Sequence, residues 1–352
     1  MCASRLSPHA TLGLPCSLDL VDQFLSKPTS EVVGVLAGAI GPFLVLGAGG
    51  KLGLHLCLML RRGLDQLGRK DKVLAVSRFL TLRSRAEFES FGIETIACDL
   101  ADATRLAELP EAPTVFFLAG VKFGTAESPN LLRSLNVEMP RHVAARFQRS
   151  RIVAFSSGCV YPFVGVDSGG STEDTRPEPI GDYAASCLAR EQAFALAAAQ
   201  NGNPVVLVRL NYSVEFRYGI LVDIAKRVLA REPIDVTMGF VNAIWQSDAV
   251  AHSIQVLALA GTPAVVINVT GAGILSVRDL ALRCGEIAGF AVEITGCEAE
   301  TAWLNNAGRS HRLLGAPPTS VETMLHWIIN WLRAGGETWG KPTGFERRDG
   351  RY

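Results

Sequence analysis

The sequence predicts an α/β protein: a doubly wound parallel sheet (Rossmann type) with a smaller C-terminal α/β lobe. Short apolar runs alternate with helix-length segments, the first run enters a glycine-rich turn, and the alternation loosens after about residue 210. Apolar strands separated by helices are typical of parallel sheets buried on both faces. With 352 residues, 48% of them hydrophobic, the chain is long enough to bury a large core.

The apolar runs predict six strands of this sheet, at residues 43–46, 72–77, 93–97, 114–119, 151–156 and 204–210. Helices of suitable length lie between them, including 128–149 and 182–201. Ligands of such sheets bind outside the carboxyl ends of the strands, so functional residues are expected just after each strand.

The stretch FLVLGAGGKLG, residues 43–53, runs from an apolar strand through a turn into a helix. Its glycines, Gly47, Gly49, Gly50 and Gly53, stand where a dinucleotide site needs a tight bend, close approach to a pyrophosphate and close helix packing. The helix N-terminus offers unsatisfied N–H groups to the phosphates. We therefore expect dinucleotide binding here, with a plain strand–turn–helix as the alternative.

The remaining segments predict three regions. Residues 1–40 form a helical extension of two short helices, broken at Lys27–Pro28, with Thr29 or Ser30 as an N-cap. Residues 41–210 form the NAD(P)-binding Rossmann domain, and residues 211–352 mainly form a substrate-binding lobe. That lobe is expected to hold helices 220–231, 248–260, 276–288 and 319–334, strands near 234–236 and 264–269, and a loop at 335–352.

Composition excludes several classes of protein. Basic and acidic residues balance at 34 each, which does not favour a nucleic-acid partner. The eight cysteines are scattered, with no CxxC, so neither a zinc site nor a disulfide framework is expected and the metal prediction is none. No apolar run has the length of a membrane span and the N-terminus does not resemble a signal peptide, so we expect a cytoplasmic protein without a membrane partner.

Further strings follow the later strands in order: CDL at 98–100, LAG at 118–120, AGVKFGTAES at 119–128, Asn136–Val137, SSGCVYP at 156–162, RLNY at 209–212 and WQSDAV at 245–250. Together they resemble the extended short-chain dehydrogenase/reductase superfamily, in its NAD(P)-dependent epimerase/dehydratase group, over roughly residues 43–334. The string 119–128 is similar to the matching loop of UDP-galactose 4-epimerases, which implies that Lys122 contacts the cofactor.

The resemblance implies that Asp99 meets the adenine, that Ser157 is the catalytic hydroxyl and that Tyr183 is the acid/base. With Lys122 they complete the predicted catalytic set of Tyr183, Ser157 and Lys122. The predicted cofactor-binding residues are Gly47, Gly49, Gly50, Lys51, Leu52, Gly53, Ser77, Arg78, Asp99, Leu100, Leu118, Ala119, Gly120, Lys122, Asn136, Ser156 and Tyr183.

The chain departs from the family at one motif. The family has Tyr-x-x-x-Lys, whereas Tyr183 is followed four residues later by Cys187. A free tyrosine has a pKa of about 10, and a neutral thiol cannot supply the positive charge that lowers it. Three alternatives stay open. Lys122 or Arg190 supplies the charge, the substrate brings its own acidity, or the protein binds the cofactor without turning it over, as a sensor or scaffold.

The residues at the end of the second predicted strand indicate which cofactor, NAD or NADP, the protein prefers. Enzymes that use NAD place Asp or Glu there for the ribose hydroxyl, whereas this chain has Ser77–Arg78, with Arg83 and Arg85 beyond. Because a guanidinium matches phosphate geometry, NADP is favoured and NAD remains possible. The alternative is that the arginines form a solvated helix start.

The substrate is expected to be a sugar-like hydroxy or carbonyl compound, for epimerisation, dehydration or net redox. Nucleotide-sugar members of the family carry an arginine for the diphosphate before the helix near 248, and residues 239–248 contain none. This departure argues against a nucleotide diphosphate sugar, with Arg209 or Arg217 as an alternative source of the charge. Predicted substrate contacts are Ser157, Cys159, Glu173, Asn211 and Trp245, although Trp245 also fits core packing.

Helices 128–149 and 182–201 resemble the pair that forms the four-helix dimer interface of the family. The resemblance therefore implies a homodimer, with a small-molecule substrate as the other partner.

Overall fold

A computed structural model describes residues 15, 17–80, 82–122 and 128–350. At its centre lies a seven-stranded sheet in the order β12-β7-β5-β4-β1-β2-β3, in which every neighbouring pair is parallel. The strands are β1 (Phe43–Leu46), β2 (Val73–Ser77), β3 (Glu94–Ala97), β4 (Thr114–Phe117), β5 (Arg151–Ser157), β7 (Val205–Leu210) and β12 (Val265–Val269). The predicted fold class is confirmed.

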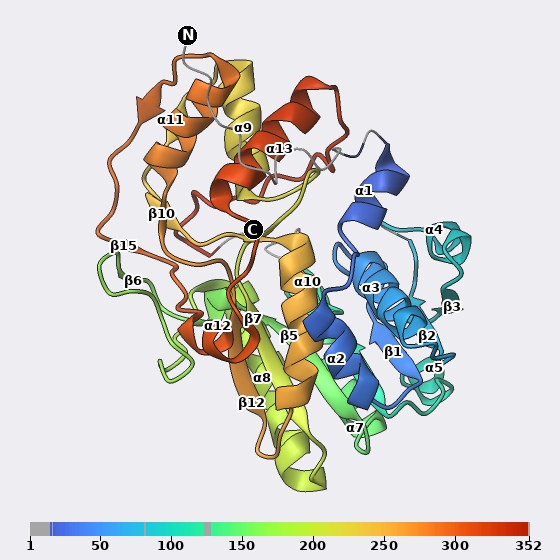
Figure 1. The fold of residues 1–352 in the computed structure, drawn as a ribbon. Helices are drawn as coiled ribbons and strands as arrows, with labels where there is room; N and C mark the ends of the chain where they lie inside the picture. The colour runs from blue at the N-terminus through green and yellow to red at the C-terminus, as the bar shows by residue number, and fades with distance from the viewer. Residues whose placement is uncertain (1–14, 16, 81, 123–127, 351–352) are drawn as a thin grey trace.

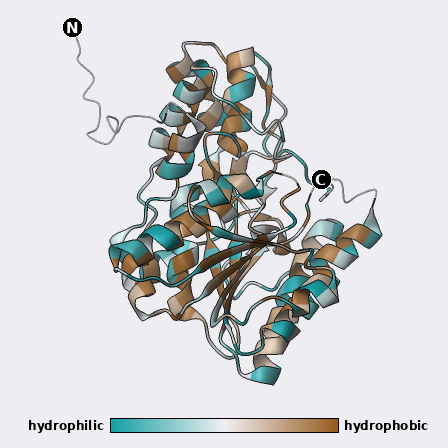
Figure 2. Ribbon diagram, turned by 90° about the vertical axis from the view of Figure 1, so that its right-hand side faces the viewer, coloured by the Kyte–Doolittle hydropathy of each residue, from teal (hydrophilic) through white to brown (hydrophobic). Residues whose placement is uncertain are grey.

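Helices cover both faces of this sheet (Figure 1). One face packs against α2 (Ser30–Gly38), α3 (Gly53–Gln66) and α10 (Gln246–Gln255), and the other against α5 (Ala103–Ala107), α7 (Met139–Arg146) and α8 (Gly181–Asn201). Phe43 and Val45 enter the first core, whereas Leu44 and Leu46 enter the second. Figure 2 shows the resulting hydrophobic strands between amphipathic helices.

The order of the strands fixes the place of a ligand site. β1 pairs with β2 on one side and with β4 on the other, so the chain changes direction across the sheet between β1 and β4. A crevice forms outside the carboxyl ends of the strands at such a point. The loops that follow β1, β2, β3 and β4 therefore meet there.

The structure corrects the assignment of residues 264–269 to the smaller lobe. β12 is an edge strand of the central sheet and pairs with β7 along its whole length. Helix α10 likewise lies against α2 and α3 on the sheet. The physical reason is that β7 would otherwise expose a row of unpaired backbone groups, which a further apolar strand satisfies.

The rest of the C-terminal region forms a second core. Helices α9 (Ile220–Ala230), α11 (Val277–Ala288) and α13 (Val321–Arg333) pack together there. The shorter elements of this region are β6 (Val164–Gly165), β8 (Ser213–Val214), β9 (Ile234–Asp235), β10 (Phe240–Val241), β11 (Ile244–Trp245), β13 (Leu275–Ser276), β14 (Ile294–Thr295), β15 (Thr301–Ala302) and α12 (Gly308–Leu314), and α12 packs against β12. Between 335 and 350 the structure describes neither helix nor strand.

The N-terminal extension consists of α1 (Leu18–Phe24) and α2, with Thr29 as the N-cap of α2 through its bond from the Val32 N–H (3.3 Å). α1 contributes Val21 and Leu25 to the core of the C-terminal lobe. α2 instead packs on the sheet, so the extension joins both cores. Residues 1–14 and 16 of the predicted extension lie outside the described residues.

The predicted helix 128–149 is interrupted. It consists of α6 (Pro129–Arg133), a π-helical turn (Ser134–Glu138) and α7. Pro140 has no backbone N–H, so an α-helical bond to the carbonyl four residues earlier, at Asn136, cannot form. The wider turn that results is a form often found at functional sites.

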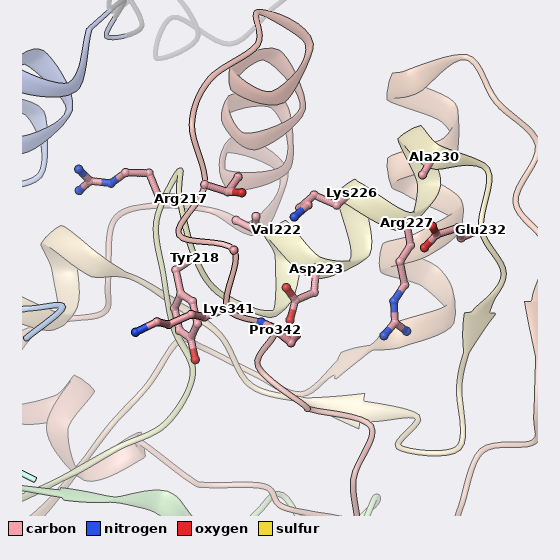
Figure 3. A pocket seen from close by; sticks show the side chains of 12 residues that line it. Arg217, Tyr218, Val222, Asp223, Lys226, Arg227, Ala230, Glu232, Lys341 and Pro342 are labelled. Carbon is pink, nitrogen blue, oxygen red and sulfur yellow. The ribbon is translucent and has the colours of Figure 1, made fainter. Parts of the chain in front are cut away.

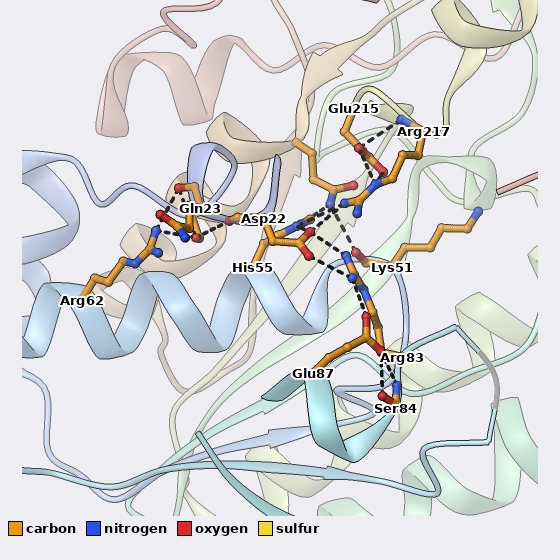
Figure 4. Close-up of polar contacts among 12 residues, drawn as sticks. Asp22, Gln23, Lys51, His55, Arg62, Arg83, Ser84, Glu87, Glu215 and Arg217 are labelled. Atoms are coloured by element: carbon orange, nitrogen blue, oxygen red, sulfur yellow. Dashed lines mark hydrogen bonds and ion pairs between the residues drawn. The ribbon is translucent and has the colours of Figure 1, made fainter. Parts of the chain in front are cut away.

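A buried ion network links the extension, the sheet helices and the lobe (Figure 4). Asp22 accepts bonds from His55 (2.8 Å), Arg83 (2.8 Å) and Arg217 (2.9 Å), and Arg217 also pairs with Glu215 (3.0 Å). Burial alone would raise the pKa of Asp22, but these partners hold it well below its usual range. Burial lowers the pKa of His55 to about 4, so the imidazole is neutral at pH 7.

Within the described part of the chain, no helix has both the length and the apolar character needed to cross a membrane.

Candidate active site

A pocket of about 150 Å³ lies at the carboxyl ends of β1 to β4. Of the residues predicted to bind the cofactor, it is lined by Gly47, Gly49, Gly50, Ser77, Arg78, Asp99, Leu100, Leu118, Ala119 and Gly120. The pocket is smaller than the roughly 300–1,000 Å³ of typical ligand sites. It therefore accommodates only part of a dinucleotide.

Sequence reasoning missed three lining residues: Cys98, Leu135 and Met139. Leu135 and Met139 are four residues apart, so they share one face of the interrupted helix. The spacing of these two apolar residues was the signal in the sequence that they share a helix face. Only the tertiary structure shows that this face lines the pocket.

The glycine-rich turn has the shape that a pyrophosphate needs. Gly47 has a φ of +84°, and a Cβ on it would stand 2.5 Å from the backbone nitrogen of Ala119. A Cβ on Gly49 would stand 2.6 Å from the Ser77 hydroxyl. The bare backbone and the start of α3 thus leave a cradle that a phosphate can approach. The residues present fit a dinucleotide cofactor.

Other residues of the turn point elsewhere. Leu52 packs against the sheet core, and a Cβ on Gly53 would meet the Ala48 carbonyl. The Lys51 ammonium lies 2.9 Å from the centre of the Tyr218 ring, while its carbonyl accepts a bond from Gln246 (3.2 Å). Burial, with the nearby charges of Lys122 and Lys341, lowers the pKa of Lys51 to about 6.

The rim of the pocket carries the residues predicted to distinguish the two cofactors. Arg78 is exposed and its guanidinium lies 3.8 Å from the Asp99 carboxylate. Ser77 accepts a bond from the Phe79 N–H (3.3 Å). Arg78 thus holds a positive charge beside the residue expected to meet the adenine.

Arg83 and Arg85 do not contribute to this rim. Arg83 is buried and bonds Asp22 and Glu87, whereas Arg85 bonds Glu89 on its own helix, α4 (Arg85–Ser90). The buried pair of Arg83 fits the alternative that these arginines serve the helix start, and a phosphate contact of Arg85 stays a prediction.

Asn136 is fully buried and holds the loop after β4 in place. Its side chain accepts from the Val121 N–H (2.8 Å) and donates to the Val121 carbonyl (2.8 Å) and to the Ser186 hydroxyl (3.0 Å). A direct cofactor contact is excluded by this burial, so that prediction is wrong. Asn136 is instead a positioning residue that ties the loop of Lys122 to α8.

Tyr183 lies in the first turn of α8, and Cys187 follows one turn later on the same face. The Lys122 ammonium lies 5.8 Å from the centre of the Tyr183 ring. Burial raises the pKa of Tyr183 well above its ordinary value, and the Cys187 and Cys159 thiols add to the shift. Burial also lowers the pKa of Lys122, with the charge of Arg347 acting in the same direction.

Two thiols share this site. Cys159 lies in the turn Gly158–Val160 after β5, and Cys187 is fully buried on α8. The interaction between the two thiols raises the pKa of Cys159 and lowers that of Cys187. The sulfur of Cys187 therefore lies beside Cys159 and Tyr183.

Arg190 is the second cation of this site. It is buried, donates to the Phe155 carbonyl (3.2 Å), and its charge lowers the pKa of both Tyr183 and Cys187. That Arg190 is too far along the helix to reach the phenol itself stays a prediction, and its effect on the pKa of Tyr183 is through its charge.

The two serines after β5 have different surroundings. The Ser156 hydroxyl is buried and donates to Glu191 (2.5 Å), which in turn pairs with Arg209 (2.7 Å). Ser157 remains partly exposed, and its hydroxyl accepts only a long bond from the Cys159 N–H (3.3 Å) among the bonds resolved. Ser157 is thus the more accessible hydroxyl.

The predicted substrate contacts divide into two groups. Asn211 is buried and donates to Asn305 (2.8 Å), while Glu173 accepts from the Asn268 N–H (2.9 Å). Trp245 has no exposed surface and packs against Phe216 with a ring separation of 5.0 Å. The prediction that Trp245 contacts substrate is wrong, because its indole lies in the core.

Neither arginine proposed for a diphosphate is available. Arg209 is 4% exposed and bonds both oxygens of Glu191. Arg217 is also 4% exposed and bonds Glu215 and Asp22. Moving either guanidinium to a ligand would leave a buried carboxylate without its partner, which costs several kcal/mol (about 3–5).

Comparison with protein families gives a match of residues 43–236 to the NAD dependent epimerase/dehydratase family. No curated protein sequence matches this chain.

Solved structures of similar fold include UDP-glucose 4-epimerase of Thermus thermophilus in complex with NAD, with a TM-score of 0.67 at 19% identity. That match covers 83% of this chain and 98% of the epimerase. UDP-glucuronic acid 4-epimerase of Bacillus cereus in complex with NAD gives 0.67 at 18% identity, covering 83% and 98%. MoeE5 in complex with UDP-glucose and NAD gives a TM-score of 0.67 at 21% identity, covering 84% of this chain and 99% of MoeE5.

The family match covers more than half of the chain. The glycine-rich turn and the pocket of this chain also fit the cofactor. The chain therefore belongs to the NAD dependent epimerase/dehydratase family and is an NAD(P)-dependent enzyme.

Proposed function

We propose that this enzyme catalyses an epimerase- or dehydratase-type reaction, or a net reduction, on a sugar-like hydroxy or carbonyl compound without a nucleotide diphosphate. The observation that carries the proposal is the distance of 5.8 Å between the Lys122 ammonium and the centre of the Tyr183 ring, with Ser157 at the end of β5. The substrate is expected to lie between these residues and the lobe that residues 211–352 mainly form.

The ion pairs of the two arginines proposed for a diphosphate support a substrate without one. The similar structures named above include complexes with UDP-glucose, whereas residues 239–248 of this chain hold no arginine. Arg209 and Arg217 are committed to buried ion pairs. A nucleotide sugar would therefore meet this lobe without the cation that the resemblance leads us to expect.

In this proposal each side chain has a defined role. Bound NAD(P) supplies the hydride exchange. Tyr183 moves a proton to or from a substrate oxygen, and the Ser157 hydroxyl donates to that oxygen. Lys122 and Arg190 replace the charge of the missing lysine, since both lie near the phenol. Asn136 keeps Lys122 in position through the Val121 backbone.

Two further properties belong to the proposal. NADP is the preferred cofactor, because Ser77 and Arg78 line the pocket rim where an enzyme that uses NAD has an acidic residue. The enzyme is a cytoplasmic homodimer that pairs through α7 and α8. The groove between these helices holds Ala144, Ala193 and Leu196, and Leu196 is 58% exposed.

The test is a substrate screen with a matched variant. Wild-type protein is incubated with NADP or NADPH and panels of free sugars, sugar acids and sugar phosphates, and turnover is followed by nicotinamide absorbance and by product analysis. Tyr183→Phe should lose turnover by about 10²–10⁴-fold while NADP affinity stays unchanged. If no panel member turns over and Tyr183→Phe changes nothing, the protein binds cofactor without catalysis, as a sensor or scaffold. Turnover of UDP-sugars alone would overturn the substrate class.

A further inference from the structure

The N-terminal extension contributes one buried carboxylate near the glycine-rich turn. Asp22 lies in α1, is 4% exposed and accepts hydrogen bonds from three segments that are far apart in the sequence (Figure 4). The donors are the His55 ring on α3 (2.8 Å), the Arg83 guanidinium after β2 (2.8 and 3.0 Å) and the Arg217 guanidinium after β8 (2.9 Å). The family match begins at residue 43, so Asp22 lies outside the part of the chain that the match covers.

His55 connects Asp22 to Gln246. A carboxylate only accepts hydrogen bonds, so the Nε2 atom of His55 carries the hydrogen of the bond to Asp22. Because burial lowers the pKa of His55 to about 4, the ring is neutral at pH 7 and its Nδ1 atom is an acceptor. This Nδ1 atom lies 2.6 Å from the side-chain nitrogen of Gln246, which is 1% exposed at the start of α10. Asp22 therefore fixes which nitrogen of His55 receives the bond from Gln246.

Gln246 in turn holds a peptide group of the glycine-rich turn. The same side-chain nitrogen donates to the Lys51 carbonyl (3.2 Å), so its two hydrogens go to two acceptors. In a trans peptide the C=O and the following N–H point in opposite directions, so a fixed Lys51 carbonyl also fixes the direction of the Leu52 N–H. Leu52 is the N-cap of α3, where backbone N–H groups are offered to a phosphate. Gln246 therefore orients a peptide group of the cofactor cradle.

Arg83 connects Asp22 to the turn a second time. Arg83 is 5% exposed and donates to both oxygens of the Asp22 carboxylate. The backbone carbonyl of Arg83 lies close to the turn, since a Cβ on Gly49 would stand 3.8 Å from it. One carboxylate thus bonds two of the segments that lie around the glycine-rich turn.

Arg217 extends the same network into the C-terminal lobe. The next residue, Tyr218, places its ring 2.9 Å from the Lys51 ammonium. Arg217 and Tyr218 both line a cavity of about 300 Å³, where their side chains leave the backbone in different directions (Figure 3). Two adjacent residues of the lobe therefore contact Asp22 and the glycine-rich turn.

We propose that Asp22 and Gln246 are positioning residues of the cofactor site, through which the N-terminal extension holds the glycine-rich turn in the shape that binds the cofactor. The apparent affinity for a ligand falls in proportion to the fraction of molecules that hold the competent shape, so a turn fixed in advance binds more tightly. The inference concerns the cofactor alone. It stands whether or not the substrate class proposed above is correct, because its test needs no turnover.

The experiment is a calorimetric titration of the full-length protein with NAD and with NADP. Gln246→Met keeps the length of the side chain and removes its donors. It should weaken binding of the preferred cofactor by roughly tenfold, as expected if the turn holds its binding shape in about a tenth of the molecules. Ser253→Ala is the matched control, because Ser253 is buried further along the same helix and donates to the Ala249 carbonyl (2.6 Å). This control should leave cofactor affinity unchanged.

Hydrogen exchange of the protein without cofactor reports on the turn itself. Peptides that cover residues 47–53, followed by mass spectrometry, should exchange faster in Gln246→Met than in wild type or in Ser253→Ala. A purely structural role of Gln246 would lower stability in both variants and leave cofactor affinity and the exchange of this turn equal to wild type. That result, or an equal loss of affinity in Ser253→Ala, would overturn the proposal.

A double-mutant cycle tests the part of Asp22. Asp22→Asn keeps the size of the side chain and removes its charge, so it should also weaken cofactor binding. Because Asp22 and Gln246 act through one histidine, the loss in the double variant Asp22→Asn/Gln246→Met should be smaller than the product of the two single losses. Should Asp22→Asn fail to fold, His55→Gln replaces it in the cycle, since its amide nitrogen still donates to Asp22 while the ring acceptor for Gln246 is gone. Losses that multiply fully would overturn the connection through His55.

Discussion

The Lys122 ammonium lies 5.8 Å from the centre of the Tyr183 ring, although Lys122 follows β4, Tyr183 lies in α8 and the two are 61 positions apart. Cys187, one helical turn after Tyr183, is fully buried and carries no such charge. The cation beside the Tyr183 ring thus comes from the loop after β4 and not from α8.

Lys122→Met should lower kcat by roughly 10²-fold, because the methionine keeps the length of the side chain but removes its charge. The pH profile for proton removal from substrate should also move to higher pH, since burial already raises the pKa of Tyr183. Steady-state kinetics between pH 6 and 10 measure both effects. Lys70→Met is the control, and an unchanged pH profile in Lys122→Met would assign the charge to Arg190 alone.

Cys187→Lys restores the family motif and tests whether the site has been rebuilt around Lys122. We expect lower activity and lower stability, because a second ammonium would be buried near the first and the Cys187 site has no exposed surface. Cys187→Ser is the size-matched control. Kinetics and thermal unfolding give the answer, and a gain in both activity and cofactor affinity would mean that the site is a degraded form of the family motif.

Arg78→Ala should weaken NADP binding by about tenfold, or about 1.4 kcal/mol, while NAD binding changes little. The reason is that Arg78 supplies the exposed guanidinium on the pocket rim, 3.8 Å from Asp99. Calorimetric titration with both cofactors measures the ratio. Arg85→Ala, which removes an exposed guanidinium paired with Glu89, should leave the ratio unchanged. Equal affinities for NAD and NADP in wild type would contradict the NADP preference.

Leu196→Glu should convert the proposed dimer into a monomer. Leu196 is exposed on α8 beside Ala193 and Ala197, and a carboxylate buried between two copies of this face would lack a partner. Sedimentation velocity at several protein concentrations measures the mass. Leu313→Glu, at another exposed leucine on α12, serves as the control. If the wild-type protein sediments as a monomer at every concentration, the proposed dimer interface is wrong.

Stability should fall as the pH drops from about 6.5 to about 4. Burial lowers the pKa of both His55 and His252 to about 4, whereas an unfolded histidine has a pKa of about 6.5. Below pH 6.5 the unfolded chain therefore binds protons that the folded chain does not, at a cost of up to about 3 kcal/mol per histidine at pH 4.

Urea unfolding at pH 7 and pH 5 measures this loss. His252→Gln should reduce the difference between the two pH values, because this variant removes one buried titrating group whose Nδ1 has no hydrogen-bond partner in the described structure. His326→Gln, at an exposed position on α13, should not reduce it. An equal loss in wild type and His252→Gln would contradict the role of His252.

The sequence by itself determined the strands and helices of the Rossmann part of the chain. It also determined the edge of the sheet at which the residues of the pocket lie. The strands and the glycine-rich turn at 47–53 could be predicted from the sequence, because strand burial and phosphate binding each require particular residue types at short spacing. For this reason Gly47, Ser77, Asp99 and Leu118 come together in one pocket, as expected from their places after the strands.

Only the tertiary structure decided which charged and aromatic residues are available to a ligand. Arg83 and Arg217 look like Arg78 in the sequence, yet each is committed to a buried carboxylate from a distant segment. Trp245 likewise packs against Phe216 in the core, where no ligand reaches its ring. The physical reason is that such partners are set by long-range packing and ion pairing, which no local pattern encodes.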